Sequence, residues 1–342
     1  MKILYGVQGT GNGHISRARM MAKHFQDRKA NVDFLFSGRD PERYFEMECF
    51  GDYQTRTGLS FITHQGSVSY LRTALQNRPV QFLREVRDLD VSGYDVILTD
   101  FEPVTAWAGK LQRRPVIGIV HQYAFHHPGV PRSKGDILSR LILRCFAPVS
   151  TGLGLHWSDF GGPIVPPIVN TSVTSQEGNS ILVYLPFEDQ QRVTRLLNQL
   201  NGWHFIQYSP DLQDGRDGNV DTRQTSFSGF KQDLQSCRAV ICNAGFELIS
   251  ECLYLGKTVL AKPVAGQGEQ IANALALSQL NYADIMHELS LNQIQNWLSA
   301  LPEARRVQYP DVAAALVEWV LSEQWHDTRG LSEDLWRKTR LA

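Results

Sequence analysis

The chain has 342 residues, a length that suits two domains of ordinary size. Apolar residues make up 42% of it and charged residues 20%, which is the balance of a soluble globular protein. The formal net charge of −1 argues against the strongly basic surface of a nucleic-acid-binding protein.

The charge is distributed unevenly between the two halves of the chain. The first 165 residues carry five more basic than acidic side chains, and the remainder carry six more acidic than basic ones. The opening residues MKILYGVQGTG lack the long apolar stretch of a signal peptide, and no run approaches the roughly 18 apolar residues of a membrane span. We therefore expect a cytoplasmic protein whose basic first half suits either an anionic partner or an ordinary solvated surface.

Short apolar runs alternate with stretches of helical periodicity, the pattern of parallel α/β units. In the first half we expect strands over 2–7, 32–38, 94–100 and 114–122, and helices near 15–25, 103–112 and 133–146. In the second half we expect strands over 180–187, 203–209, 239–243 and 258–263, and helices near 189–200, 246–255 and 311–325. A polar loop is expected over 210–219.

The segment GGPIVPPIV, residues 161–169, is rich in proline and glycine and is the expected linker. The chain is thus predicted to form two wound α/β domains, 1–165 and 166–342, that face each other across a cleft. The amphipathic helix near 311–325 is expected to pack back across the join.

The segment GVQGTGNGHISRAR, residues 6–19, places a glycine-rich turn between the first strand and the first helix. A dinucleotide fingerprint needs a third glycine where this chain has His14, and a Walker loop needs a Gly-Lys-Ser/Thr sequence that is absent. The pattern instead lets the backbone at Gly11 and Gly13 approach a ligand, followed by an imidazole in the first helical turn. His14 is a candidate general base or substrate contact; the alternative is a helix-capping histidine behind a tight turn.

Polar side chains also lie at the ends of the predicted strands over 94–100 and 114–122. Because ligands of open parallel sheets bind at the carboxyl ends of strands, these side chains are expected to face the same crevice as His14. We expect Asp100 to orient His14 or to act in its place, with helix capping as the alternative. The acceptor-side candidates are Arg17, Glu102 and His121.

A second glycine-bearing turn follows the predicted strand over 239–243 and leads into a helix that Gly256 suits as its end. Glycine at a helix start lets an anion approach the free amides, so a diphosphate is expected near Gly245. Glu251 suits the two hydroxyls of a ribose. The donor-side candidates are Gly11, Gly13, Asn243, Gly245, Phe246, Glu251, Gln267, Gly268, Glu269 and Gln270.

The pattern N-x-G-x5-E…P-x5-EQ-x-x-NA over residues 243–274 resembles the donor-binding signature of GT-B glycosyltransferases of the MurG and UDP-glycosyltransferase branch. With GxGxGHxxR at 9–17 and TDFEP at 99–103, the chain is also similar to a group of prokaryotic proteins in that class. The resemblance covers both halves and implies two Rossmann-like domains. The chain departs from the signature at Asn243, where His is usual, and at Leu248, where a hydroxyl often contacts phosphate.

The resemblance implies a hexosyltransferase that moves a sugar from a nucleoside-diphosphate donor, UDP-linked, to an acceptor hydroxyl. It implies Gly245 at the diphosphate, Glu251 at the ribose, and Glu269 with Gln270 at the donor sugar. No E-x7-E motif starts at Glu247, which favours inversion. Helix amides oppose the charge on the diphosphate, and neither the acidic pair within 88–90 nor the histidines of 121–127 form a persuasive metal motif. We therefore expect no metal and no cofactor.

Two other functions fit the same motifs: a non-hydrolysing sugar-nucleotide epimerase and a non-catalytic nucleotide-sugar-binding protein. The basic amphipathic segment 131–146 suits peripheral contact with the inner face of a membrane and a lipid-linked acceptor of the cell envelope. A buried helix with a basic rim is the alternative. No nucleic-acid partner is expected.

Overall fold

The computed structural model describes residues 1–342 except 60–62, 65–66, 69–77 and 133–144. The N-terminal half forms a seven-stranded sheet in the order β3-β2-β1-β6-β7-β8-β9, with every pair parallel. Its strands are β1 (Lys2–Gln8), β2 (Asn31–Ser37), β3 (Tyr53–Arg56), β6 (Val96–Asp100), β7 (Val116–Val120), β8 (Thr151–Leu155) and β9 (Ile164–Val165).

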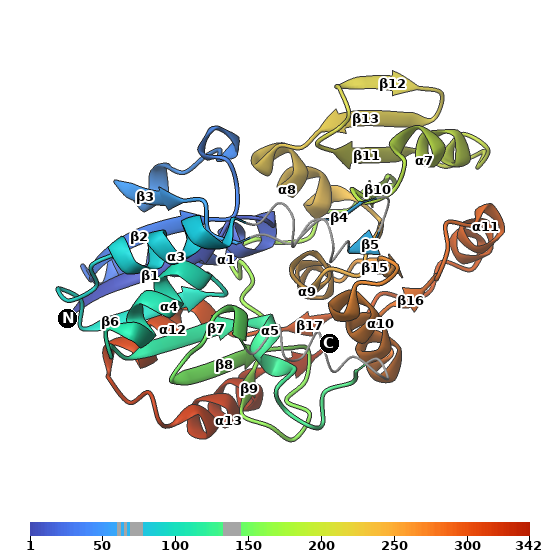
Figure 1. Ribbon diagram of the computed structural model, residues 1–342. Coiled ribbons are helices and arrows are strands. Elements are labelled where there is room, and N and C mark those ends of the chain that lie inside the picture. The colour runs from blue at the N-terminus through green and yellow to red at the C-terminus, as the bar shows by residue number, and fades with distance from the viewer. Residues whose placement is uncertain (60–62, 65–66, 69–77, 133–144) are drawn as a thin grey trace.

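The C-terminal half forms a second seven-stranded sheet in the order β12-β13-β11-β10-β14-β15-β16. All its pairs are parallel except β12 with β13. Its strands are β10 (Ile181–Tyr184), β11 (Phe205–Ser209), β12 (Gly215–Asp217), β13 (Val220–Gln224), β14 (Ala239–Asn243), β15 (Thr258–Lys262) and β16 (Asp284–Ile285). Figure 1 shows the two sheets beside each other.

Helices follow the strands in both halves. In the N-terminal half they are α1 (Asn12–Asp27), α3 (Pro79–Asp88), α4 (Pro103–Leu111) and α5 (His121–Ala124). In the C-terminal half they are α7 (Gln190–Leu197), α8 (Phe227–Ser236), α9 (Phe246–Leu255), α10 (Gly268–Leu280), α11 (Leu291–Ala300), α12 (Val312–Leu321) and α13 (Thr328–Lys338). Two Rossmann-like units thus follow one another, which confirms the predicted fold class.

Burial explains the regularity of the strands. Every residue of β6, β7, β14 and β15 is buried, as the continuous apolar runs predict for central parallel strands covered on both faces. The left-handed conformation of Gly256, with φ 67°, ends α9 as predicted. The expected polar loop over 210–219 is wrong in part, because it contains β12. This edge strand has the exposed sequence GRD, so no apolar alternation marks it.

The order of the strands creates one crevice in each half. β1 pairs with β2 on one side and with β6 on the other, and β10 likewise pairs with β11 and β14. Chain connections therefore diverge at the carboxyl ends of β1 and β10, the switch points where open α/β sheets bind ligands. α1 and α9 begin beside these two points.

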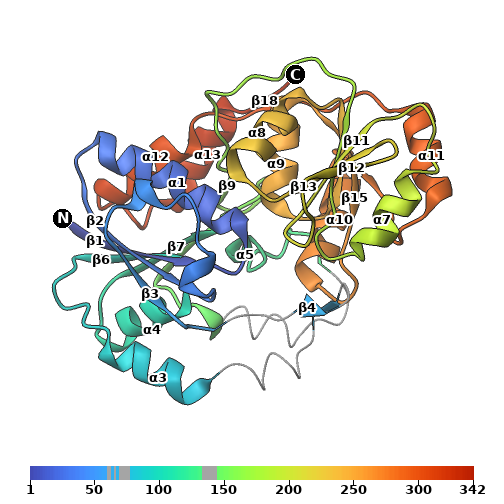
Figure 2. The same ribbon diagram turned by 90° about the horizontal axis from the view of Figure 1, so that it is seen from above.

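The last two helices lie on the N-terminal half although they come from the end of the chain. α12 packs against α1, and α13 packs against β9, where the Ser332 hydroxyl and the Trp336 indole both donate to the Ile164 carbonyl oxygen at 2.6 and 2.7 Å. Figure 2 shows α12 beside α1. One buried apolar cluster therefore contains side chains from both halves, and it joins them.

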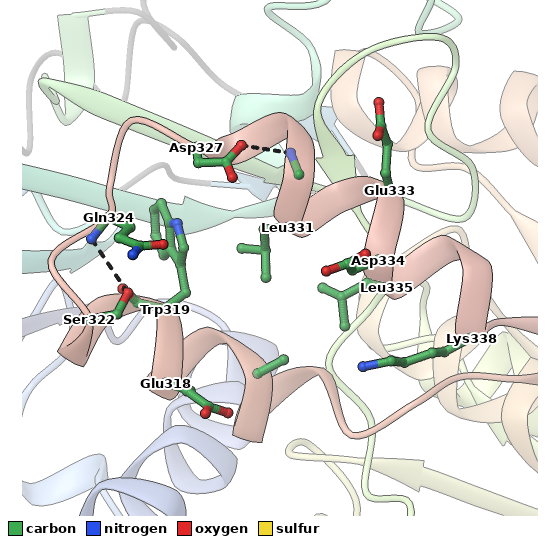
Figure 3. A pocket seen from close by; sticks show the side chains of 12 residues that line it. Glu318, Trp319, Ser322, Gln324, Asp327, Leu331, Glu333, Asp334, Leu335 and Lys338 are labelled. Atoms are coloured by element: carbon green, nitrogen blue, oxygen red, sulfur yellow. Dashed lines mark hydrogen bonds between the residues drawn. The ribbon is translucent and has the colours of Figure 1, made fainter.

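A groove of about 390 Å³ lies between α12 and α13 (Figure 3). Four acidic side chains surround it, those of Glu318, Asp327, Glu333 and Asp334. None of the residues that line this groove is a sequence-predicted site residue, so it is separate from the two switch points.

Candidate active site

His14 and Asp100 meet at the switch point of the N-terminal sheet. His14 lies in the first turn of α1 and Asp100 is the last residue of β6, and His14 Nδ1 is 2.7 Å from Asp100 Oδ1. The Asp100 side chain is fully buried, whereas the His14 side chain is 16% exposed. When Nδ1 donates to the carboxylate, Nε2 is the ring nitrogen free to accept a proton. Asp100 therefore orients His14 and does not cap the following helix.

Arg17 holds the other side of the Asp100 carboxylate. Its Nε donates to Oδ2 at 2.8 Å and its Nη2 to Oδ1 at 2.6 Å, and its Nη1 donates to Glu247 of α9. Burial lowers the pKa of Arg17, but the two carboxylates outweigh it and the net direction is upward. Arg17 is 3% exposed. Both ends of its guanidinium are therefore bonded inside the protein, and its placement on the acceptor side stays a prediction.

Asp100 remains charged in this cluster. Burial raises the pKa of the Asp100 carboxyl. The nearby charges of Arg17 and then of His14 lower that pKa by more, so the net pKa lies below the ordinary value. A charged Asp100 stabilises an imidazolium at His14, which is the form that follows proton transfer to Nε2.

Glu102 has a structural position. Its carboxylate accepts the backbone N–H groups of Val104 and Thr105 at 2.8 and 2.6 Å and the Ser37 hydroxyl at 2.6 Å, so it caps α4. It is fully buried, and burial raises its pKa. These bonds and the surrounding packing enclose the carboxylate, and its acceptor-side role stays a prediction.

His121 is also enclosed. Its Nδ1 lies 2.8 Å from the Leu155 carbonyl oxygen, and its Nε2 lies 2.7 Å from Oδ1 of Asn273 in α10. The ring stacks on Phe246 at 3.9 Å with an interplanar angle of 4°. His121 is 1% exposed and Phe246 2% exposed. The pair therefore joins the two halves, and the acceptor role of His121 and the donor role of Phe246 stay predictions.

Trp157 extends this apolar contact between the halves. Its indole lies 5.1 Å from the Phe246 ring, and its Nε1 donates to the Ser250 hydroxyl of α9 at 2.8 Å. The contact places the start of α9 against the N-terminal sheet. The two switch points are thus held next to each other by packing as well as by charge.

Three helices begin around the switch points without a side-chain cap, namely α1 at Gly11, α9 at Gly245 and α10 at Gln267. A Cβ on Gly245 would meet open space, so the backbone there borders a volume that a ligand can enter. Unbonded amides at a helix start, together with the helix dipole, favour an anion. Gly268 is the first residue of α10 and contributes to the third of these starts.

Two buried amide oxygens at the second switch point lack a hydrogen-bond partner in the part of the chain that the structure describes. They are Oδ1 of Asn243, whose Nδ2 donates to the Lys262 carbonyl oxygen at 3.1 Å, and Oε1 of Gln267. Buried polar atoms are rarely left unpaired, so these oxygens suit a hydroxyl or N–H group of a ligand.

The other donor-side candidates have partners within the protein. Lys231 of α8 donates to both oxygens of Glu251, and Gln122 Nε2 donates to Glu269 Oε2 at 3.0 Å across the join. Gln270 is buried and its Oε1 accepts the Val264 backbone N–H at 3.0 Å, so this amide shapes the loop before α10.

Several charged residues at the site were missed from the sequence. Glu247 lies between two motif positions but no pattern marked it, and Lys262 with Glu188 forms an ion pair of 2.7 Å at the ends of β15 and β10. Residues 133–144, most of the predicted basic amphipathic helix, lie outside the described residues. Across the described part of the chain, no group of three or more His, Cys, Asp or Glu side chains is arranged to hold a metal ion.

Two wound α/β units that meet through the starts of α1 and α9 define a protein of the GT-B class. The model of the family described as glycosyl transferase family 1 matches residues 1–302. The chain therefore belongs to glycosyl transferase family 1 and is a glycosyltransferase. No curated protein is similar to it in sequence.

Solved glycosyltransferase structures share the fold over nearly the whole chain. The kitacinnamycin glycotransferase has a TM-score of 0.60 at 14% identity, and the match covers 98% of this chain and 97% of that one. LpCGTa, solved in complex with UDP, has a TM-score of 0.59 at 13% identity and 98% coverage of both chains. MurG of Acinetobacter baumannii has a TM-score of 0.55 at 15% identity, with 98% of this chain and all of that one covered. Among the described residues, no helix is both long and apolar enough to cross a membrane.

Proposed function

We propose that this glycosyltransferase moves a sugar from a UDP-linked donor to an acceptor hydroxyl with inversion and without a metal ion. The observation that carries the proposal is the arrangement of His14, oriented by buried Asp100, near the uncapped start of α9, to which Arg17 connects it. This arrangement offers a base on one side and an anion site on the other. Transfer to a hydroxyl needs both.

In the proposed reaction, His14 Nε2 accepts the proton of the acceptor hydroxyl as its oxygen bonds to the anomeric carbon of the donor sugar. The bond from that carbon to the diphosphate oxygen breaks, and the electron pair leaves with the diphosphate. Attack from the face opposite the leaving group inverts the anomeric carbon. The amides of the first turn of α9, which begins directly after Gly245, oppose the charge that develops on the diphosphate.

The nucleoside is assigned to the C-terminal half. Glu251 suits the ribose hydroxyls, with Lys231 fixing its carboxylate, and Glu269 suits a hydroxyl of the donor sugar. The unpartnered oxygens of Asn243 and Gln267 add acceptors at the same switch point. A UDP-linked donor is proposed because it fits this donor motif, and the similar LpCGTa structure was solved with UDP.

Product analysis tests this function. The protein is incubated with UDP-, dTDP- and GDP-sugars together with a panel of alcohol acceptors, and products are separated and weighed by mass spectrometry. Transfer or slow donor hydrolysis is expected with a UDP-sugar, and proton NMR of the product gives the anomeric configuration. Rates unchanged by a chelator support metal independence. A donor that changes only its sugar configuration would identify an epimerase, and binding without any product would identify a sensor.

The acceptor and the location of the enzyme form a separate proposal. We infer a cytoplasmic enzyme that meets a lipid-linked acceptor at the inner face of a membrane, because the segment 131–146 has an amphipathic pattern in which basic residues flank apolar ones. Sedimentation with anionic vesicles at low salt tests the contact. Neutral vesicles are the control, and equal recovery in both supernatants would contradict it.

A further inference from the structure

Glu247 is the one member of the charged cluster at His14 that comes from the opposite half. It lies in the first turn of α9, its side chain is 28% exposed, and it accepts from Arg17. A Cβ on Gly13 would lie 2.7 Å from Glu247 Oε2, so glycine at this position of α1 makes room for the carboxylate. Gly13 thus admits a side chain of the other half, and its approach to the donor stays a prediction.

Charge balance gives Glu247 a consequence for His14. The bidentate pair of Arg17 with Asp100 is neutral by itself, so the guanidinium offsets part of the attraction that the Asp100 carboxylate offers to an imidazolium. Glu247 brings a second negative charge to the same guanidinium, and the cluster then carries a net charge of −1 when His14 is neutral. Protonation of His14 then brings the net charge of the cluster to zero.

The interaction is also visible from the side of Glu247. Burial raises the pKa of its carboxyl, Arg17 and then His14 lower it, and the net direction is downward. The attraction between opposite charges is mutual, so the Glu247 carboxylate also attracts an imidazolium at His14.

Other titratable groups face this cluster from β1 and α5. Tyr5 and Tyr123 are phenols whose pKa values burial raises well above the ordinary value, so they are uncharged. His121 stacks on the residue before Glu247 and contributes to its electrostatic surroundings. None of these three residues is substituted in the variants below. Their electrostatic contributions are therefore the same in wild type and variant and cancel in the comparison.

We propose that Glu247 is a positioning residue for the base: from the donor-binding half it holds Arg17 and supplies the negative charge that favours the His14 imidazolium formed during transfer. His14 therefore has this supporting charge only when the two halves of the chain are in contact. This inference rests on the proposed function, in which His14 takes the acceptor proton. It assigns Glu247 to the chemical step and not to donor affinity.

The direct test follows the His14 imidazole by NMR over pH 4–9, without any substrate. The His14 signal is identified by its absence from His14→Ala among the ten histidines. In Glu247→Gln the titration midpoint of His14 is expected to move to lower pH by about one unit, the low end of the effect of a neighbouring charge. Glu247→Asp keeps the charge and is expected to restore most of the wild-type midpoint.

Asp311→Asn is the matched control. Asp311 Oδ2 lies 3.2 Å from His24 Nε2 at the other end of α1, so this variant also removes a carboxylate that contacts α1. Asn keeps the oxygen that caps α12 through the Ala314 N–H. The His14 midpoint is expected to stay at its wild-type value. Thermal unfolding of each variant shows whether it is folded.

A kinetic readout separates the role from a purely structural one. With an active donor, Glu247→Gln is expected to lower kcat by about tenfold or more, with the acidic limb of the kcat/KM profile moved to lower pH and the donor KM nearly unchanged. Equal His14 midpoints in folded Glu247→Gln and wild type would overturn the proposal, as would a variant that changes donor KM alone. If wild type transfers no sugar from any donor, the proposed function fails instead, and the NMR comparison still decides whether Glu247 acts on His14.

Discussion

His14 Nδ1 lies 2.7 Å from Asp100 Oδ1, although 86 residues separate them in the chain. The contact forms because β1 and β6 are neighbours in the sheet, so the helix that follows β1 begins next to the last residue of β6. A buried carboxylate thereby fixes a partly exposed imidazole at the point where the fold binds ligands.

His14→Ala is expected to reduce kcat by about 10²–10⁴-fold, because the acceptor hydroxyl loses the base that removes its proton. Donor affinity, measured by calorimetry with UDP, is expected to change little. The control is His24→Ala, which removes a histidine of similar exposure from the other end of α1. Equal turnover in the two variants would remove His14 from the mechanism.

Gly245→Ala is expected to weaken UDP binding by about tenfold without lowering stability. The backbone there has φ −78° and ψ 144°, which any residue adopts, and the added Cβ enters the open space assigned to the diphosphate. Gly93→Ala is the control, since a Cβ at Gly93 also meets open space but lies away from α9. The same UDP affinity in both variants would place the diphosphate elsewhere.

Phe246→Ala is expected to lower the free energy of unfolding by about 3–5 kcal/mol, the cost of truncating a buried aromatic side chain. The ring fills the join between the halves, where it contacts His121 and Trp157. Denaturant unfolding measures the change. A decrease in the unfolding free energy of less than about 1 kcal/mol, together with loss of donor binding, would show that Phe246 belongs to the donor site.

Acidification is expected to destabilise the protein through Asp100. Its pKa is lowered in the folded state, so its contribution to stability is present above the ordinary carboxyl pKa and is lost as the pH falls through the lower folded-state pKa. Glu102 acts in the opposite sense, since its folded-state pKa is raised. The unfolding free energies of wild type and Asp100→Asn, measured from pH 7 to pH 3, separate the two contributions.

Asp100→Asn removes one of the two carboxylates that pair with Arg17. It is expected to lower the free energy of unfolding by about 3–5 kcal/mol at pH 7. This difference from wild type is expected to shrink as the pH falls, because the wild-type carboxyl becomes protonated as well. A difference that stays constant down to pH 3 would show that folding does not shift the pKa of Asp100, and a change of opposite sign would show that its folded-state pKa is raised.

The sequence by itself determined the parts of the molecule that depend on local patterns. Continuous apolar runs identified the central strands, and glycines before His14 and at Gly245 located the two turns where helices begin. Polar residues at strand ends pointed to the switch points, because parallel strands all end on the same side of a sheet. The pairing of His14 with Asp100 followed from these rules.

Only the tertiary structure decided which of the polar side chains predicted at the crevice are enclosed by other elements. Arg17, Glu102 and His121 are enclosed because each finds buried partners, two of them in the opposite half of the chain. Glu247 had no pattern of its own, since its contact depends on how closely α9 approaches α1. A sequence specifies the period of each element, but the direction of a polar side chain at its end is set by packing between elements distant in the chain.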